Sequence, residues 1–517
     1  MSDAWAALPL TAPIAVIGAG AMGAGIAQIA AVAGHPVLLH DKREGAAEAA
    51  IAGIRAALGK LVDKSKLKRD VFDQAVANLR AASALTELND CALVVEAIVE
   101  NLEAKRGLFT QLESVVSASS ILATNTSSIS ITAIAAVLAR PERLVGMHFF
   151  NPAPQMPLVE VISGAATSRD VAERVFATSA GWGKTPVHAR STPGFIVNRV
   201  ARPFYAEALR LLQEGVADPA TLDVVMRESG GFRMGPFELM DLIGHDVNYA
   251  VTRSVFDAFY GDSRFQPSLI QLELVNAGYL GRKSGRGFYD YRDGAAKAEA
   301  STEPTRARPA HIEIDGGTPL GEALGRRLEA RGCSFVLRNG QFADGRIASA
   351  DGAALHLTDG RSATERSAMT GVANIVLIDL MLEAATARRA AVSRADQCSP
   401  AAWQAAVGLL QAADFEVSAL RDSPGMAVMR TVAMLANEAC DAVHQQVCSA
   451  KATDLAMRGG VGYPIGPLEW ADRIGAARVL SVLDDLGHHY GEPRYRASPL
   501  LRQRVWAGRG LREDRDD

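Results

Sequence analysis

A glycine-rich turn between a short apolar strand and an alanine-rich helix constrains this 517-residue chain most strongly. Residues 14–17 (Ile-Ala-Val-Ile) favour a strand, residues 18–23 (Gly-Ala-Gly-Ala-Met-Gly) follow at once, and residues 24–33 favour a helix. Residues 36–40 form a second strand candidate, which ends at Asp41. This order of strand, glycine turn, helix, strand and acid is typical of a dinucleotide-binding βαβ unit.

Each glycine of the turn has a physical task. Gly18 suits a tight corner, Gly20 lets the main chain approach a pyrophosphate, and Gly23 lets the helix pack on the strand. The pyrophosphate would bind the free N–H groups of a helix that begins near Ala21. Asp41 lies 18 residues after Gly23, where a carboxylate accepts bonds from ribose hydroxyls and repels a 2′-phosphate. The sequence therefore predicts NAD as the cofactor.

Composition and charge exclude several classes of protein. At about 150 residues per domain, the length predicts three or four domains. Hydrophobic residues make up 48% of the chain and charged residues 22%, as in a globular protein. The net charge of −4 is nearly balanced, so nothing draws the chain to nucleic acid or to an anionic membrane.

The five cysteines are few and show no CxxC spacing. They argue for a reducing compartment and against a disulfide framework or a zinc site. We find no signal peptide and no apolar run of about 20 residues, so we expect a cytoplasmic protein without a membrane span or a bound metal.

Polar residues stand at the ends of three strand candidates. Residues 91–97 run into Glu100, residues 121–124 are followed by a polar run containing Ser127, and the strand candidate of residues 144–150 contains His148. The carboxyl ends of parallel strands meet at one edge of a sheet. We therefore expect Glu100, Ser127 and His148 to converge beside the cofactor.

These residue types suit the oxidation of an alcohol. His148 can take a proton near neutral pH, and a carboxylate on its other ring nitrogen, which we assign to Glu100, would fix the tautomer. Ser127 could hold the oxygen that loses its proton. The alternatives are a strand histidine bonded to the backbone, a helix N-terminal acid at Glu100 and an N-cap at Ser127.

Several segments together resemble the L-3-hydroxyacyl-CoA dehydrogenases. They are residues 18–25, 94–102, 124–130 and 148–154 (His-Phe-Phe-Asn-Pro-Ala-Pro), followed by residues 193–199 (Pro-Gly-Phe-Ile-Val-Asn-Arg). The resemblance covers residues 12–291 and implies NAD-dependent oxidation of an (S)-3-hydroxyacyl-CoA to the 3-oxo thioester.

The resemblance also assigns site residues. It implies His148 as the base, Glu100 as the residue that orients it, and Ser127 and Asn198 as contacts of the reacting oxygen. A basic cluster between residues 41 and 89, in a predicted helical hairpin, offers Lys60 and Lys64 for the nucleotide end of coenzyme A, although it also fits a solvated helix face. The predicted cofactor contacts are Gly18, Gly20, Ala21, Met22, Gly23, Asp41, Ala97, Glu100, Lys105, Asn125, Ser127, Asn151 and Lys283.

The acyl chain stays open at this point. The long bacterial form that the chain resembles suggests 3-hydroxyadipyl-CoA, as in phenylacetate degradation, and the alternative is 3-hydroxybutyryl-CoA. No cation can be assigned from the sequence to a second carboxylate. A third possibility, from another class, is a non-catalytic NAD-binding structural protein on the same fold.

The last part of the chain repeats an earlier one. With a constant offset of 231, residues 193–244 align without gaps to residues 424–475, and 17 of the 52 pairs are identical. Such a match indicates duplication of a structural unit. Asn198 pairs with Met429, so we expect the second copy to pack and not to catalyse. The copy could replace a partner subunit internally or add an interface, and a homo-oligomer, dimer or higher, remains open.

The predicted fold class is an α/β Rossmann-type NAD-binding domain, an all-α domain, a small cofactor-free α/β domain and a second copy of the all-α domain. The helical domain could cover the cofactor's open face. The predicted boundaries are 1–190 (NAD-binding), 191–291 (helical), 292–311 (linker), 312–421 (small α/β) and 422–517 (second helical).

Overall fold

The computed structural model describes every residue except 1–4, 339, 341, 343 and 514–517, so the ends of the first and last predicted domains lie outside the described residues. The chain forms two compact units: residues 1–199 with 442–461 (unit 1), and residues 200–441 with 462–517 (unit 2). The predicted second helical domain therefore contributes to both units.

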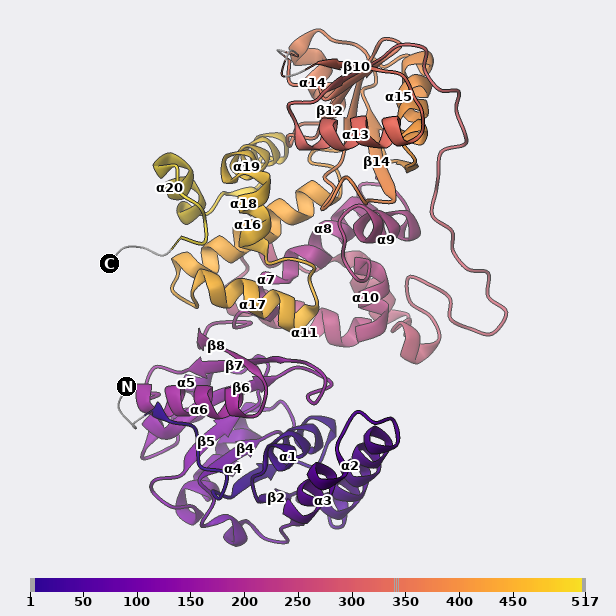
Figure 1. The fold of residues 1–517 in the computed structure, drawn as a ribbon. Coiled ribbons are helices and arrows are strands. Elements are labelled where there is room, and N and C mark those ends of the chain that lie inside the picture. Colours follow the sequence, from indigo (N-terminus) through magenta and orange to yellow (C-terminus); the bar gives the residue numbers. More distant parts are fainter. Residues whose placement is uncertain (1–4, 339, 341, 343, 514–517) are drawn as a thin grey trace. The chain divides into compact units, whose positions relative to one another are not determined.

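An eight-stranded sheet forms the centre of unit 1, in the order β3-β2-β1-β4-β5-β6-β7-β8 (Figure 1). All neighbouring strands are parallel except β6 and β7, which are antiparallel. The strands are β1 (Ile14–Ile17), β2 (Val37–His40), β3 (Leu79–Ala81), β4 (Leu93–Glu96), β5 (Ile121–Thr124), β6 (Leu144–Phe149), β7 (Leu158–Ser163) and β8 (Thr185–Arg190). Strands β3 and β8 were not predicted, because β3 is very short and β8 mixes polar residues with apolar ones.

Helices surround this sheet. They are α1 (Ala21–Ala33), α2 (Ala46–Asp63), α3 (Arg69–Asn78), α4 (Leu102–Val115), α5 (Ile131–Ala135), α6 (Arg169–Gly181), α7 (Val197–Val200) and α17 (Ala450–Val461). Helices α2 and α3 confirm the predicted helical hairpin. Helix α17 comes from the distant repeat segment and packs against β7 and β8.

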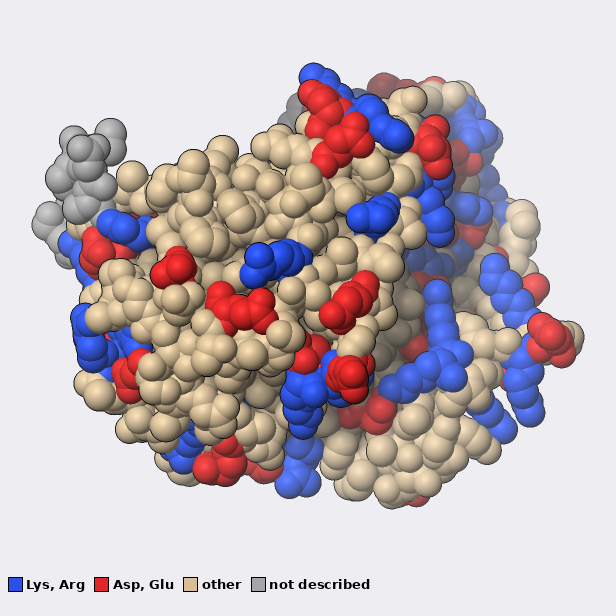
Figure 2. Space-filling view, turned by 90° about the horizontal axis from the view of Figure 1, so that it is seen from below, with Lys and Arg blue, Asp and Glu red and all other residues tan. Residues whose placement is uncertain are grey.

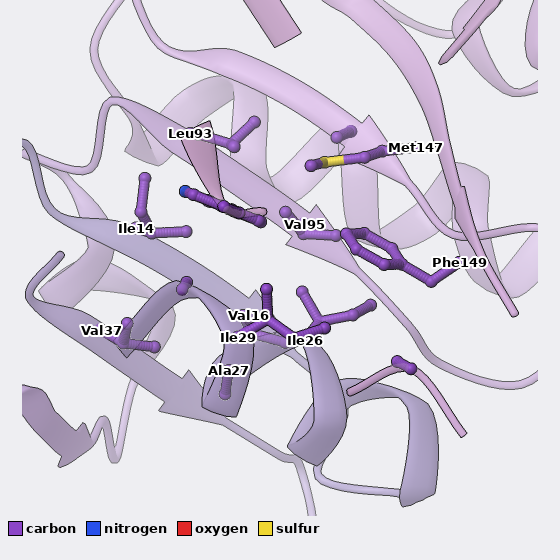
Figure 3. Packing of buried hydrophobic residues seen from close by; sticks show 14 of the residues in the cluster. Ile14, Val16, Ile26, Ala27, Ile29, Val37, Leu93, Val95, Met147 and Phe149 are labelled. Atoms are coloured by element: carbon purple, nitrogen blue, oxygen red, sulfur yellow. The ribbon is translucent and has the colours of Figure 1, made fainter. Parts of the chain in front are cut away.

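The core of unit 1 lies between α1 and the first strands. All four residues of β1 are buried, and Ile26 and Ile29 of α1 pack into the same cluster as Val16 and Val95 (Figure 3). Each fully buried aliphatic side chain stabilises the fold by about 1.5–3 kcal/mol. This packing holds the corner between β1 and α1 rigid.

A second sheet lies in unit 2, with seven strands in the order β10-β9-β11-β12-β13-β14-β15. The strands are β9 (Ile312–Asp315), β10 (Val336–Arg338), β11 (Ala348–Ala350), β12 (Ala353–Leu357), β13 (Ile375–Ile378), β14 (Arg389–Arg394) and β15 (Glu416–Ala419). The sequence predicts strands at residues 335–337, 354–357, 375–379 and 415–420, which correspond to β10, β12, β13 and β15. Strands β9, β11 and β14 were not predicted, because they are short or rich in alanine and polar residues.

The helices of unit 2 come from both repeat segments and from the small sheet domain. They are α8 (Arg202–Gln213), α9 (Pro219–Glu228), α10 (Pro236–Ile243), α11 (His245–Ala258), α12 (Leu269–Asn276), α13 (Pro319–Ala330), α14 (Ala363–Thr370), α15 (Pro400–Ala412), α16 (Val428–His444, which continues into unit 1), α18 (Pro467–Ile474), α19 (Ala476–Tyr490) and α20 (Pro499–Ala507). The sequence predicts one helix over residues 236–260, but Gly244, which has a φ of +97°, separates α10 from α11.

Buried ion pairs join the two repeat segments inside unit 2. Arg264 lies 3.0 Å from Glu438, and Arg494 lies 3.6 Å from Glu207. Arg430 also contacts Glu207, at 2.8 Å. Breaking such a buried pair leaves an uncompensated charge, which costs about 3–5 kcal/mol. The two segments therefore contribute opposite charges to the same buried ion pairs.

The surface carries charges of both signs. On the face drawn in Figure 2, basic and acidic side chains are interspersed with uncharged ones, in keeping with the net charge of −4. No helix among the described residues is both long and apolar enough to span a bilayer.

Candidate active site

The glycine turn has the geometry that the sequence predicts. A Cβ atom on Gly18, whose φ is +104°, would lie 2.4 Å from the Ala97 carbonyl oxygen, and one on Gly23 would lie 1.7 Å from the Gly18 oxygen. A Cβ on Gly20 would meet nothing within 4 Å. Gly18 and Gly23 are thus fixed by packing, whereas the backbone at Gly20 and at the start of α1 is open to a ligand.

This difference predicts separate effects for two alanine substitutions. Gly20 has a φ of −71°, which alanine adopts without strain, so Gly20→Ala should keep the melting temperature within a few degrees. Its methyl group would occupy the open face and weaken NAD binding by about tenfold or more. Gly23→Ala should destabilise the fold itself. Titration calorimetry and thermal melts check both, and unchanged NAD affinity in Gly20→Ala would contradict a pyrophosphate at this turn.

Asp41 is placed to complete the nucleotide site. Its Oδ2 accepts a hydrogen bond from the Ala19 N–H at 2.8 Å, which ties it to the glycine turn. The Arg43 side chain donates to the same carboxylate and, with the backbone N–H groups, holds the pKa of Asp41 well below its usual range. The carboxylate is therefore ionised at neutral pH and can accept bonds from ribose hydroxyls.

A buried lysine organises the carboxyl end of β4. The Lys105 side chain is only 1% exposed, and its Nζ lies 2.6 Å from Glu96 and 3.3 Å from Glu100. Glu96 is also buried and accepts a hydrogen bond from Thr124 Oγ1 at 2.6 Å. Lys105 therefore links α4 to the strand end, and its single positive charge lies within 3.3 Å of both carboxylates.

Glu100 is joined to the loop that follows β5. Its Oε1 accepts hydrogen bonds from Thr126 Oγ1 at 2.7 Å and from the Ser127 N–H at 2.9 Å. Burial raises the pKa of Glu100, but the charge of Lys105 and the bonds from Thr126 and Ser127 outweigh it, so the pKa is lowered overall. Asn198 of α7 donates through Nδ2 to the Ser127 carbonyl oxygen at 3.3 Å. Three of the four predicted catalytic residues thus form one connected network.

The carboxylate bonded to His148 is Glu160, and our assignment of Glu100 to that position was wrong. His148 Nδ1 lies 2.7 Å from Glu160 Oε2. Strands β6 and β7 are antiparallel neighbours, and their register places these two residues opposite each other. Directly opposite residues have Cβ atoms about 4.5–5.5 Å apart. Glu100 follows β4, which is separated from β6 by β5.

Glu160 is itself held by the start of the helical segment. Its side chain is fully buried, and Oε1 accepts hydrogen bonds from the N–H groups of Ile196 at 3.0 Å and Val197 at 2.9 Å. The sequence does contain a signal for Glu160, because it is the one charged residue in the apolar run of residues 158–162. A carboxylate buried in such a run needs specific hydrogen-bonding partners.

Two aromatic rings lie against His148, and a hydrogen bond fixes the backbone of its neighbour Phe149. The Phe150 ring lies 4.5 Å from the imidazole, centroid to centroid, and the Phe195 ring lies 5.9 Å from it. Asn125 Oδ1 accepts a hydrogen bond from the Phe149 N–H at 2.8 Å, which links the end of β5 to β6. His148 is 5% exposed, so its imidazole is largely shielded from water.

The other predicted residues are placed as follows. Ala97 faces Gly18 through its carbonyl group, Asn151 is exposed two residues after the end of β6, and Lys60 and Lys64 are exposed at the end of α2. Lys283 belongs to unit 2, where its Nζ donates to Asp246 at 2.7 Å. Ala21 and Met22 form the first turn of α1.

Comparison with known families matches most of the chain, apart mainly from residues 292–354. Residues 13–192 match the model described as "3-hydroxyacyl-CoA dehydrogenase, NAD binding domain". Residues 194–291 and again 425–515 match the C-terminal domain of that family. Residues 355–424 match a "3-hydroxybutyryl-CoA dehydrogenase reduced Rossmann-fold domain".

Individual relatives agree with these matches. A protein of Escherichia coli K12 named 3-hydroxyadipyl-CoA dehydrogenase is 45% identical over 495 residues, which is 95% of this chain and 97% of the relative. The human mitochondrial hydroxyacyl-coenzyme A dehydrogenase is 41% identical over 54% of this chain and 91% of its own length.

A solved structure extends the likeness to the fold. The crystal structure titled 3-hydroxybutyryl-CoA dehydrogenase from Escherichia coli K12 substr. MG1655 matches with a TM-score of 0.88 and 43% identity, over 97% of this chain and 99% of that one. The chain thus has a Rossmann NAD-binding domain, a helical C-terminal domain and a further sheet domain, and it belongs to the 3-hydroxyacyl-CoA dehydrogenase family.

Proposed function

We propose that this chain oxidises (S)-3-hydroxyacyl-CoA thioesters to 3-oxoacyl-CoA with NAD, and that His148 is the base. The observation that carries the proposal is the buried pair of His148 and Glu160, 2.7 Å apart, in the domain that carries the glycine turn. The residues of that turn suit NAD, since the backbone at Gly20 is open and Asp41 is ionised nearby. NAD supplies the acceptor for the hydride that leaves C3.

The residues around His148 fit the removal of a proton. Glu160 accepts the Nδ1 proton of His148, which leaves the Nε2 lone pair free to take the proton of the 3-hydroxyl group. As the imidazole becomes positively charged, the Glu160 carboxylate stabilises it. In the reverse direction, the imidazolium returns the proton to the oxygen.

Ser127 and Asn198 are proposed to position the reacting oxygen. The 3.3 Å bond between Asn198 and the Ser127 carbonyl oxygen keeps α7 and the loop after β5 together. Glu100 and Lys105 are proposed to act through this loop, with Glu100 as the residue that holds Ser127 and Lys105 as the cation that holds Glu100. The roles of Asn151, Lys283, Lys60 and Lys64 remain those predicted from the sequence.

We propose 3-hydroxyadipyl-CoA as the substrate, because the relative of that name is similar over nearly its whole length. The competing substrate is 3-hydroxybutyryl-CoA, the name carried by the similar solved structure. We expect kcat/KM to be at least tenfold higher for the adipyl thioester, measured as NADH formation. A preference for the butyryl thioester would overturn this assignment, and no NADH with either would overturn the dehydrogenase proposal.

The second helical segment is proposed to be an internal duplicate that packs in place of a partner subunit. Its support is the ungapped sequence repeat and the reciprocal pairs Arg264–Glu438 and Arg494–Glu207. Met429 stands where the first copy has Asn198, so the duplicate lacks the polar group proposed to hold the substrate oxygen. A homo-oligomer and a cytoplasmic location stay predictions.

A further inference from the structure

A cavity in unit 2 contains a buried arginine that has no acidic partner. The cavity has a volume of about 480 Å³ and is lined by Arg202, Tyr205, Arg210, Glu214, Glu492 and Arg494, among others. Small-molecule sites commonly have volumes of about 300–1,000 Å³. Arg202 is 6% exposed, so its charge is almost entirely removed from water.

The other charges around this cavity are paired with one another. Arg210 lies 2.9 Å from Glu492, Arg494 lies 3.6 Å from Glu207, and Arg430 lies 2.8 Å from Glu207 and 3.0 Å from Glu214. These three arginines and three glutamates balance. Arg202 therefore adds one positive charge that the surrounding side chains do not neutralise.

The contacts of Arg202 itself confirm that surplus. Within the described residues, its guanidinium donates one side-chain hydrogen bond, to Thr252 Oγ1 at 3.1 Å. Its Cζ lies 4.9 Å from the centroid of the Tyr205 ring. Its Nε is buried without a partner. Burial lowers the pKa of Arg202, as expected for a cation that has lost water and gained no carboxylate.

The fold of the helical segment does not require this arginine. In the repeat alignment, the position of Arg202 is occupied by Ala433, which is buried as well. By contrast, Arg199 aligns with Arg430, and Glu207 aligns with Glu438. The repeated ion pairs thus belong to the shared architecture, and Arg202 does not. An unpaired buried charge costs several kcal/mol, so its presence is better explained by a ligand than by packing.

We propose that this cavity binds a carboxylate group through Arg202. A guanidinium and a carboxylate match in shape and form two parallel hydrogen bonds. One carboxylate group at Arg202 would balance the surplus, whereas a phosphate would bring two negative charges to one point in a cavity that Glu214 and Glu492 also line. Two sources supply such a group: the free end of a dicarboxylic acyl thioester, which rests on the proposed function, and a free dicarboxylate.

The test uses the full-length chain with Arg202→Met, Arg202→Lys and a matched control, Arg253→Met. Arg253 lies beside Thr252 on α11, is about half exposed and pairs with Asp257. Two measurements are made on each protein: kcat/KM for the 3-hydroxyadipyl and 3-hydroxybutyryl thioesters, and the melting temperature with and without adipate. The Arg202→Met variant should melt at or above the wild-type temperature without ligand, because it removes an uncompensated charge.

If the acyl end is the ligand, Arg202→Met should lower kcat/KM for the adipyl thioester about 10- to 100-fold and change the butyryl value less than twofold, because a charge-assisted bond is lost. Arg202→Lys should fall between wild type and Arg202→Met. If a free dicarboxylate is the ligand, the ratio stays unchanged and adipate raises the melting temperature of the wild type but not of Arg202→Met.

The proposal is overturned if Arg202→Met changes neither the ratio nor the adipate effect. It is also overturned if the variant melts lower and loses activity equally with both thioesters, since Arg202 would then be structural. A wild type that oxidises neither thioester would refute the proposed function, and the adipate measurement would still decide the carboxylate site.

Discussion

Replacing His148 by glutamine should lower kcat by about 10³-fold while the NAD dissociation constant stays within about twofold. General-base catalysis by a positioned side chain contributes about 10²–10⁴-fold, and glutamine fills a similar volume without accepting a proton. His148 bonds to Glu160, whereas Asp41, which is proposed to bind the cofactor, bonds to Ala19 and Arg43, so the substitution leaves the bonds of Asp41 unchanged. Stopped-flow NADH formation and calorimetric NAD titration measure the two effects separately.

Two outcomes would contradict the role of His148. Equal losses in kcat and NAD affinity would show that the substitution damages the domain. A kcat within tenfold of wild type would show that another group removes the proton. The melting temperature of the variant serves as the control for folding.

Replacing Glu160 by glutamine should lower kcat by about 10²- to 10⁴-fold, for a reason that the hydrogen bonds make specific. Oε1 of residue 160 accepts from the N–H groups of Ile196 and Val197, so the amide oxygen of glutamine would stay on that side. The amide N–H₂ would then face His148 Nδ1 and force that nitrogen to act as an acceptor. The proton would move to Nε2, where it blocks the uptake of the hydroxyl proton.

Glu100→Gln is the matched comparison for this prediction. Glu100 bonds to Thr126, Ser127 and Lys105. The amide oxygen of glutamine can still accept the bonds from Thr126 and Ser127, and the substitution leaves the tautomer of His148 unchanged. We expect a loss in kcat of less than about tenfold. A larger loss for Glu100→Gln than for Glu160→Gln would show that the pair of His148 and Glu160 is not the catalytic pair.

The same contrast shows where sequence reasoning was limited. It predicted that Glu100, Ser127 and His148 lie at the carboxyl ends of three strands, and the structure confirms that β4, β5 and β6 are parallel and adjacent in that order. It also assumed that residues at neighbouring strand ends meet. Which residues meet across strands depends on the register and direction of those strands. The carboxylate opposite His148 comes from β7, which runs antiparallel to β6, and nothing in the sequence specifies that direction.

The buried arginine gives a second example. The sequence contains 54 lysines and arginines, and their pattern alone does not distinguish a solvated cation from an enclosed one. Arg202 differs only because the charged residues around it form ion pairs with one another, so that its own charge has no acidic partner. The residues around it come from positions as far apart as 205 and 494. A charge balance of this kind requires coordinates.

By itself the sequence determined the βαβ unit with its glycine turn, the histidine on a strand end, the helical repeat and the family that these features indicate. Those features are local or periodic, so the backbone preferences of a few neighbouring residues are enough to specify them. Only the tertiary structure decided which carboxylate holds His148 and which arginine lacks a partner. Hydrogen bonds and ion pairs form between residues far apart in the chain, and their strength depends on distances of a few ångströms that no sequence spacing encodes.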